Sequence, residues 1–259
     1  MRPGAVRPIG VFDSGVGGLS ILKALRAELP SENFVYLADT AHAPYGERGD
    51  AYVIDRTRAI VARLRDEHAI KALVIACNTA TAAAIHLLRA EHPGLPLVGV
   101  EPALKPAAAL SRTRRIGVLA TRLTLASAKL RALHDSLRGA AEFILQPCDG
   151  LADAIENHDG AQMAALCARY TQAIGRFGDA PGEVDTLVLG CTHYAFASQE
   201  LAALVPRGTR LVETGAPVAR QARRLLQAAG QVAPAGAGQV EFLSTGSLPD
   251  LLAAATRWL

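Results

Sequence analysis

The feature that most constrains the fold is a series of short apolar segments separated by helical patterns, in an order that occurs twice. The segment Ile9-Gly-Val-Phe-Asp-Ser14 returns later in the chain as Ile116-Gly-Val-Leu-Ala-Thr121. In the first occurrence we expect strands at 9–12, 34–37, 73–76 and 97–100, and helices at 19–29, 51–67 and 80–90. Strands that alternate with helices favour parallel sheets covered by helices. The sequence therefore predicts an α/β protein with two similar lobes, related by a pseudo-twofold axis, each a mostly parallel sheet flanked by helices.

The boundary between the two lobes is expected near Glu101-Pro102, where the pattern restarts. A further strand at 210–212 and a helix at 217–228 follow the second repeat, and the tail at 249–259 has a helical pattern. We expect residues 1–100 and 211–259 to form the first lobe, and residues 101–210 to form the second.

Composition excludes several classes of protein. Hydrophobic residues make up 50% of the chain and charged residues 20%, which is typical of a globular protein. The 27 basic and 24 acidic residues are well mixed, so no nucleic-acid partner is expected. There is no signal-peptide pattern and no apolar run of membrane length, so we expect a cytoplasmic protein with no membrane association. Free thiols are the default for four cysteines without a C-x-x-C pair.

Two of the cysteines end corresponding apolar segments. Cys77 is followed by Asn78-Thr79, and Cys191 by Thr192-His193. Parallel sheets bind their ligands at the carboxyl ends of strands, and a thiol can serve as a base or an acid depending on its protonation. Two thiols on opposite sides of a carbon could remove a proton on one face and return one on the other.

Other uses of these cysteines stay open. A lone cysteine after a strand is often a core residue. The spacing of Cys191 and His193 matches no closed zinc pattern, so we predict no metal. A hydrolase with Cys191 as nucleophile and His193 as base is chemically reasonable, but it leaves Cys77 without a role. Cys148 and Cys167 lack polar neighbours in the sequence and are interpreted as structural.

The turn Asp13-Ser-Gly-Val-Gly-Gly18 lies between an expected strand and an expected helix. Its glycines and the helix N-terminus suit a small carboxylate, whereas Ser20 interrupts the dinucleotide fingerprint. In the alternative interpretation Asp13 caps the helix. The segment Pro44-Tyr45-Gly46 could bring the backbone, or the Tyr45 hydroxyl, close to a ligand, but it is also ordinary turn chemistry.

Taken together, Phe12-Asp-Ser-Gly-Val-Gly-Gly-Leu19, Pro44-Tyr-Gly46, Ala76-Cys-Asn-Thr79 and Gly190-Cys-Thr-His-Tyr194 resemble glutamate racemase, over nearly the whole chain. The resemblance implies two lobes that enclose the substrate, no cofactor, and production of D-glutamate for peptidoglycan. It implies that Cys77 takes the α-proton of D-glutamate and Cys191 that of L-glutamate.

The resemblance also implies roles for other residues. Asp13 would assist Cys77 and His193 would assist Cys191, and Glu156 is the best match for a further catalytic carboxylate, although Ala-Ile-Glu156 replaces the usual Leu-Val-Glu. The positions that match substrate-holding residues are Asp13, Ser14, Pro44, Tyr45, Gly46, Cys77, Asn78, Thr79, Thr121, Thr124, Cys191, Thr192 and His193.

Related activities and partners also follow from the resemblance. Racemases of aspartate or hydantoins use the same two-thiol chemistry, and a non-catalytic carboxylate-binding protein would keep the lobes. The segment at 100–107 resembles that of a subgroup regulated by a cell-wall precursor, and a homodimer is common in the family. Glu213-Thr214 departs from the residues that relatives commonly have there.

Overall fold

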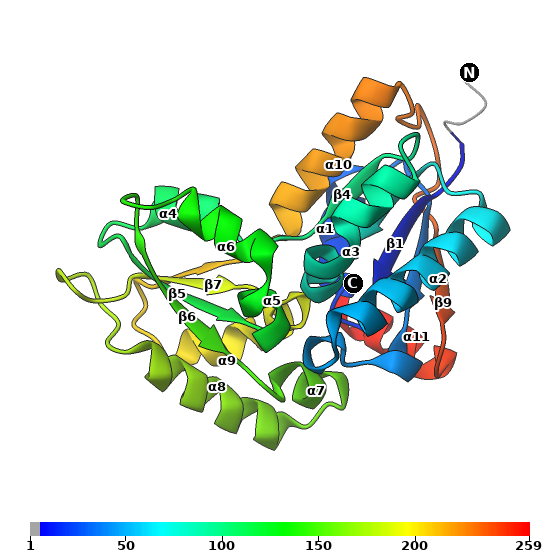
Figure 1. Ribbon diagram of the computed structural model, residues 1–259. Helices are drawn as coiled ribbons and strands as arrows, with labels where there is room; N and C mark the ends of the chain where they lie inside the picture. Colours follow the sequence, from blue (N-terminus) through cyan, green and yellow to red (C-terminus); the bar gives the residue numbers. More distant parts are fainter. Residues whose placement is uncertain (1–5) are drawn as a thin grey trace. The chain divides into compact units, whose positions relative to one another are not determined.

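A computed structural model describes residues 6–259, which form two compact units. The first unit runs up to Val100 and resumes over Gly215–Leu259, and the second unit is Glu101–Thr214. Each unit contains its own parallel sheet with helices packed on it (Figure 1). The predicted α/β class with two parallel sheets flanked by helices is confirmed.

The sheet of the first unit has five strands in the order β4-β3-β1-β2-β9, all parallel to their neighbours. Its strands are β1 (Ile9–Asp13), β2 (Phe34–Ala38), β3 (Ala72–Ile75), β4 (Leu97–Gly99) and β9 (Val240–Ser244). Its helices are α1 (Leu19–Glu28), α2 (Asp50–His68), α3 (Asn78–Glu91), α10 (Gly215–Ala229) and α11 (Leu248–Trp258), with the short 3-10 helices η1 (Thr40–His42) and η2 (Tyr45–Glu47). Helix α1 packs against α10 and α11, and α2 packs against α3.

The sheet of the second unit has four parallel strands in the order β6-β5-β7-β8. Its strands are β5 (Arg115–Ala120), β6 (Glu142–Pro147), β7 (Thr186–Leu189) and β8 (Arg210–Val212). Its helices are α4 (Leu104–Leu110), α5 (Arg122–Ala126), α6 (Ala128–Asp135), α7 (Leu151–Glu156), α8 (Gly160–Ile174) and α9 (Ser198–Ala203), with the 3-10 helix η3 (Thr192–Ala197).

The repeat in the sequence corresponds to a repeat in topology. The order β4-β3-β1-β2 in one sheet matches β8-β7-β5-β6 in the other, and β9 is added at one edge of the first sheet. Gly10 of β1 pairs with Leu73, and Gly117 of β5 pairs with Leu187 in the same register. At both glycines an added Cβ would lie 2.9 Å from an isoleucine side chain, so each central strand has a close approach at the same place.

Two details differ from the sequence-based expectation. The strand β8 pairs with β7, so the chain returns to the first unit at Gly215 rather than at residue 211. The strands β6 and β9 carry partly exposed residues instead of a continuous buried run, which is why their apolar signal is weak. The connection from β1 to β2 through α1 and the connection from β2 to β3 through α2 run in opposite directions along the sheet. Right-handed crossovers therefore place α1 and α2 on opposite faces of the sheet.

Candidate functional site

In each unit the candidate residues follow two neighbouring strands, β1 and β3 or β5 and β7. From the first strand of each pair, the chain adds its next strand on one side and the following strand on the other. In the first unit β1 ends at Asp13 and β3 is followed by Ala76 and Cys77. In the second unit β5 is followed by Thr121, and β7 by Gly190 and Cys191. Open parallel sheets bind ligands at such reversal points, so the fold places both cysteines where a ligand is expected.

Cys77 lies at the N-terminus of α3. Its backbone is extended, and its sulfur accepts a hydrogen bond from Ala80 N at 3.4 Å, so the thiol is the helix cap. The Ser14 Oγ lies 3.6 Å from the same sulfur, and Cys77 is only 5% exposed. The positive end of the helix dipole and the Ala80 N–H both favour negative charge on this sulfur, and the thiolate is the form of a thiol that acts as a base.

Asp13 ends β1, the neighbour of the strand β3 that leads to Cys77, and is fully buried. Its Oδ2 accepts a hydrogen bond from Gly15 N at 3.0 Å. The alternative that Asp13 caps the next helix is wrong, because α1 begins after Gly18 and has no side-chain cap. A Cβ at position 18 would lie 2.6 Å from the Asp13 Cβ and 2.9 Å from the Tyr36 hydroxyl, so the turn needs a glycine there.

Asn78 is a buried amide whose hydrogen-bonding groups are unused within residues 6–259. Asn78 is 3% exposed, and neither its Nδ2 nor its Oδ1 has a hydrogen-bond partner among these residues. Buried polar groups are almost always paired, and each exception calls for an explanation. A ligand with both donors and acceptors, placed at the N-terminus of α3, would satisfy this amide.

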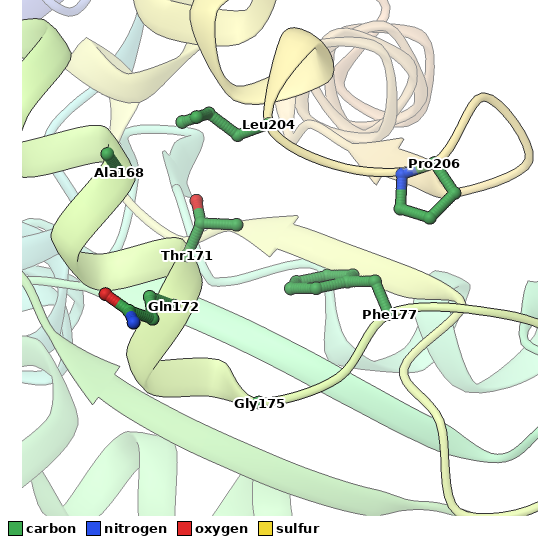
Figure 2. Close-up of a pocket in the computed structure, with 7 residues that line it drawn as sticks. All are labelled: Ala168, Thr171, Gln172, Gly175, Phe177, Leu204 and Pro206. Carbon is green, nitrogen blue, oxygen red and sulfur yellow. The ribbon is translucent and has the colours of Figure 1, made fainter.

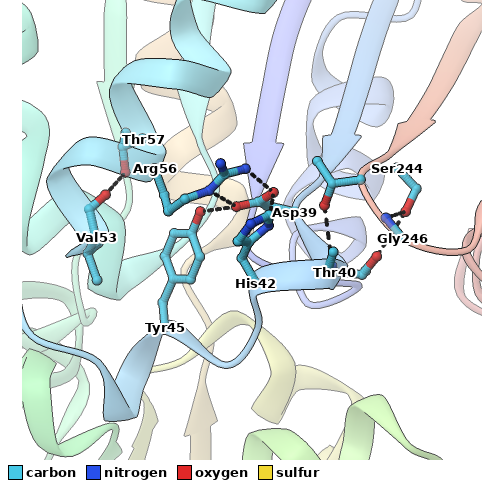
Figure 3. Close-up of polar contacts among 11 residues, drawn as sticks. Asp39, Thr40, His42, Tyr45, Val53, Arg56, Thr57, Ser244 and Gly246 are labelled. Carbon is cyan, nitrogen blue, oxygen red and sulfur yellow. Dashed lines mark hydrogen bonds and ion pairs between the residues drawn. The ribbon is translucent and has the colours of Figure 1, made fainter.

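Tyr45 belongs to η2 and is 1% exposed. Its ring centroid lies 6.2 Å from that of Phe12, the residue before Asp13. The hydroxyl donates to Asp39 Oδ2, as Figure 3 shows. The sequence suggested that either the Tyr45 hydroxyl or the backbone could contact a ligand. The hydroxyl is already bound to Asp39, so the backbone of Pro44–Gly46 is the candidate for that contact.

In the second unit Cys191, His193 and Glu156 form a chain of contacts. His193 Nδ1 lies 3.8 Å from the Cys191 sulfur, and His193 Nε2 lies 2.7 Å from Glu156 Oε2. Burial opposes protonation of the imidazole, but its hydrogen bonds with Cys191 and Glu156 outweigh burial and raise the pKa of His193 well above 6.5. His193 is thus held between the Cys191 sulfur and the Glu156 carboxylate, and Glu156 stabilises its imidazolium form.

Thr121 and Thr124 lie at the start of α5, next to the end of β5. Thr121 Oγ1 accepts from Thr124 N at 3.2 Å and donates to Thr124 Oγ1 at 2.9 Å. Thr192 follows Cys191 and is 3% exposed. These hydroxyl groups lie at the carboxyl ends of β5 and β7, so they share the sheet edge that carries Cys191.

The other two cysteines lie in the core of the second unit, as expected. Burial raises the pKa of the Cys148 thiol strongly and that of Cys167 to about 11. Both stay protonated at neutral pH and pack with apolar neighbours such as Leu151 and Tyr170. Their structural interpretation agrees with these surroundings.

A separate hollow of about 360 Å³ lies between α8 and the segment after α9 (Figure 2). Its lining residues are Ala168, Thr171, Gln172, Gly175, Phe177, Leu204 and Pro206. None of them is a predicted site residue. The described part of the chain has no group of three or more His, Cys, Asp or Glu side chains able to hold a metal, and none of its helices has the length and hydropathy to cross a membrane.

Sequence reasoning missed Asp39 and Arg56. Asp39 follows β2 directly and is fully buried, and Arg56 of α2 binds it with two hydrogen bonds. A polar residue directly after a buried strand is the same signal that identified Cys77, so Asp39 could have been found. Arg56 could not, because nothing local links position 56 to position 39.

Comparisons with known proteins identify the family of this chain. A family model described as Asp/Glu/Hydantoin racemase matches residues 19–222. Glutamate racemase from Pseudomonas aeruginosa is 48% identical over 244 residues, which cover 93% of this chain and 89% of that protein. Among solved structures, glutamate racemase isoform RacE1 from Bacillus anthracis has a TM-score of 0.86 at 29% identity and covers 98% of this chain and 94% of its own. The Escherichia coli glutamate racemase, solved with L-glutamate and the activator UDP-MurNAc-Ala, has a TM-score of 0.84 at 32% identity, with 97% and 95% covered. The chain belongs to the Asp/Glu/hydantoin racemase family.

Proposed function

We propose that this protein interconverts L- and D-glutamate with two thiols: one of Cys77 and Cys191 removes the α-proton, and the other gives its own proton to the opposite face of the carbon. The observation that carries the proposal is the matched position of the two thiols. Each follows the strand next to the central strand of its sheet, β3 or β7, and each has a different polar partner nearby. A racemase needs this combination, because it must handle a proton on two faces of one carbon.

In the direction from D-glutamate, the Cys77 thiolate forms an S–H bond with the α-proton, and the C–H electron pair stays on the substrate, delocalised into its carboxylate. The Cys191 thiol then gives its proton to the opposite face and becomes a thiolate. The reverse reaction starts from the Cys191 thiolate. Asp13 assists Cys77, and His193 with Glu156 assists Cys191.

The carbanion-like intermediate has no cofactor to hold its charge in this proposal, so fixed donors must do so. The Asn78 amide, the hydroxyl groups of Ser14, Thr79, Thr121, Thr124 and Thr192, and the backbone at Pro44–Gly46 are assigned to the substrate. Preorganised donors in a site shielded from water stabilise developing charge more strongly than water does. The unpartnered Asn78 amide supports this assignment most directly.

The test is incubation of purified protein with D-glutamate in heavy water, followed by optical rotation and by NMR of the α-proton. The proposal expects L-glutamate to form with deuterium at the α-carbon. Cys77→Ala and Cys191→Ala should each abolish racemisation. Full activity of Cys77→Ala would contradict the two-thiol mechanism and favour hydrolysis by Cys191 and His193, and turnover of aspartate alone would contradict the substrate.

We also propose that the enzyme acts in the cytoplasm, supplies D-glutamate for peptidoglycan and responds to a cell-wall precursor. The Escherichia coli relative was solved with the activator UDP-MurNAc-Ala, and the segment at 100–107 joins the two units in this chain. Addition of UDP-MurNAc-Ala should raise the rate, and an unchanged rate would contradict regulation. We propose in addition that the protein forms a homodimer. Sedimentation with and without the precursor tests this, and a monomer under both conditions would contradict it.

A further inference from the structure

A partly buried ion pair between Arg56 and Asp39 holds the hydroxyl group of Tyr45. Arg56 Nε donates to Asp39 Oδ2 at 3.0 Å and Arg56 Nη2 donates to Asp39 Oδ1 at 2.8 Å, while the Tyr45 hydroxyl donates to Oδ2 (Figure 3). Asp39 is fully buried, and the Arg56 side chain is 25% exposed. A two-pronged arginine–carboxylate contact fixes direction as well as distance, which a lysine cannot reproduce.

The carboxylate stays ionised in this setting. Burial raises the pKa of Asp39, but hydrogen bonds from Arg56, Tyr45 and Thr245 outweigh burial and leave the pKa below its usual value. His42 Nδ1 lies 3.1 Å from Asp39 Oδ1 and completes its surroundings. The acceptor that holds the Tyr45 hydroxyl is therefore charged at neutral pH.

The segment that leads from Asp39 to Tyr45 is also bound near its start by residues at the end of the edge strand β9. Thr40 Oγ1 lies 2.9 Å from Ser244 Oγ, and Ala41 N donates to Thr245 Oγ1 at 3.3 Å. The 3-10 helix η2, which begins with Tyr45, contacts α3, whose first residue is Asn78. Tyr45 thus connects the Asp39–Arg56 pair with the part of the first unit that carries Cys77.

We propose that Arg56 is a positioning residue for racemisation: through Asp39 it holds Tyr45, and so sets where the Pro44–Gly46 backbone meets the substrate. Because Nε and Nη2 are both engaged by Asp39, we assign Arg56 a role through Asp39 and not a direct contact with the substrate. This inference rests on the proposed contact between Pro44–Gly46 and glutamate.

The test compares Arg56→Lys, Tyr45→Phe and the double variant by steady-state kinetics with both enantiomers. The matched control is Arg58→Lys, because Arg58 lies on the same helix as Arg56 and forms a half-exposed ion pair with Glu91 of α3. We expect KM to rise about tenfold in each single variant, the size of one lost charged hydrogen bond, with a much smaller change in kcat. Because both substitutions act through one contact, the double variant should have a KM close to that of the worse single variant.

Thermal unfolding of the same variants separates positioning from stability. A lower Tm with an unchanged KM would make Arg56 merely structural and overturn the inference, as would KM effects that multiply in the double variant. If Arg56→Lys does not fold, Tyr45→Phe decides alone. Gly46→Val separates the proposed substrate contact of Pro44–Gly46 from the proposed role of Arg56. If Gly46→Val raises KM while Tyr45→Phe and Arg56→Lys leave KM unchanged, the role of Arg56 is overturned and the substrate contact stands.

Discussion

Replacing Glu156 with Gln tests the proposed catalytic chain of the second unit. The substitution keeps the shape of the side chain but removes the charge that faces His193 Nε2 at 2.7 Å. His193 is 6% exposed, so water cannot easily replace the lost carboxylate. The Gln amide oxygen can still accept a hydrogen bond from Nε2, but it no longer balances the charge of the imidazolium.

A hydrogen bond to a charged group contributes about 1.5–3 kcal/mol, which corresponds to about 1–2 pKa units. We expect the pKa of His193 to fall by this amount in Glu156→Gln, and kcat/KM to fall about 10- to 100-fold. Since L- and D-glutamate have equal free energies in water, kcat/KM must fall equally in both directions. A larger effect in one direction is expected only in kcat or in the α-deuterium isotope effect.

Stability should change with pH in a defined direction. The pKa of His193 is raised in the folded protein, so its stabilisation is fully present below about pH 6.5 and is lost as pH rises through the raised pKa. The free energies of unfolding of wild type and Glu156→Gln should therefore differ most on the acidic side of neutral, while Glu156 is still ionised. They should converge at alkaline pH.

The assay is an NMR titration of the His193 imidazole nitrogens, combined with kinetics and urea unfolding across pH. Asp153→Asn is the matched control, because it removes the same charge from an exposed position in the same helix, α7. An unchanged pKa of His193 in Glu156→Gln would refute the electrostatic reasoning. An equal loss of activity in Asp153→Asn would refute the assignment to the contact with His193.

Three further substitutions test other parts of the structure. Asn78→Ala should raise KM for glutamate while the free energy of unfolding changes by less than about 1 kcal/mol, because the amide has no partner within the described residues; a large loss of stability would contradict this. Gly18→Ala should destabilise the protein by about 1–3 kcal/mol in urea unfolding, because the new methyl group would lie 2.6 Å from the Asp13 Cβ; a neutral effect would show that the turn can move. Asp185 accepts hydrogen bonds from Ser111 Oγ and Arg112 N, and although burial alone would raise the pKa of its carboxyl, these bonds lower it to about 2. Its stabilisation is present above about pH 4 and lost as pH falls through 2, so Asp185→Asn should cost about 2 kcal/mol at neutral pH and much less in acid, as measured by unfolding across pH.

The sequence alone was enough to predict the α/β class and the position of the two cysteines. Buried parallel strands are short apolar runs, and the residue that follows each run must lie at the carboxyl edge of the sheet. Cys77 and Cys191 could therefore be placed at equivalent edges before any coordinates were known. Gly10 and Gly117 also repeat in the sequence. Each lies in a central strand where an isoleucine side chain approaches so closely that a larger residue would not fit.

The family resemblance already named His193 and Glu156, but the contacts among these residues were decided only by the tertiary structure. Glu156 ends α7 and His193 lies in η3, and Arg56 reaches Asp39 from the second turn of α2. Hydrophobic periodicity reports which face of an element is buried, whereas a hydrogen bond depends on how connecting segments of particular length bring two side chains within about 3 Å. The edge strand β9 is a similar case, since its partly exposed residues become a strand only beside β2. The local pattern thus determined where the two strand-end thiols lie, and the packing of segments far apart in the chain determined which side chains contact His193 and Tyr45.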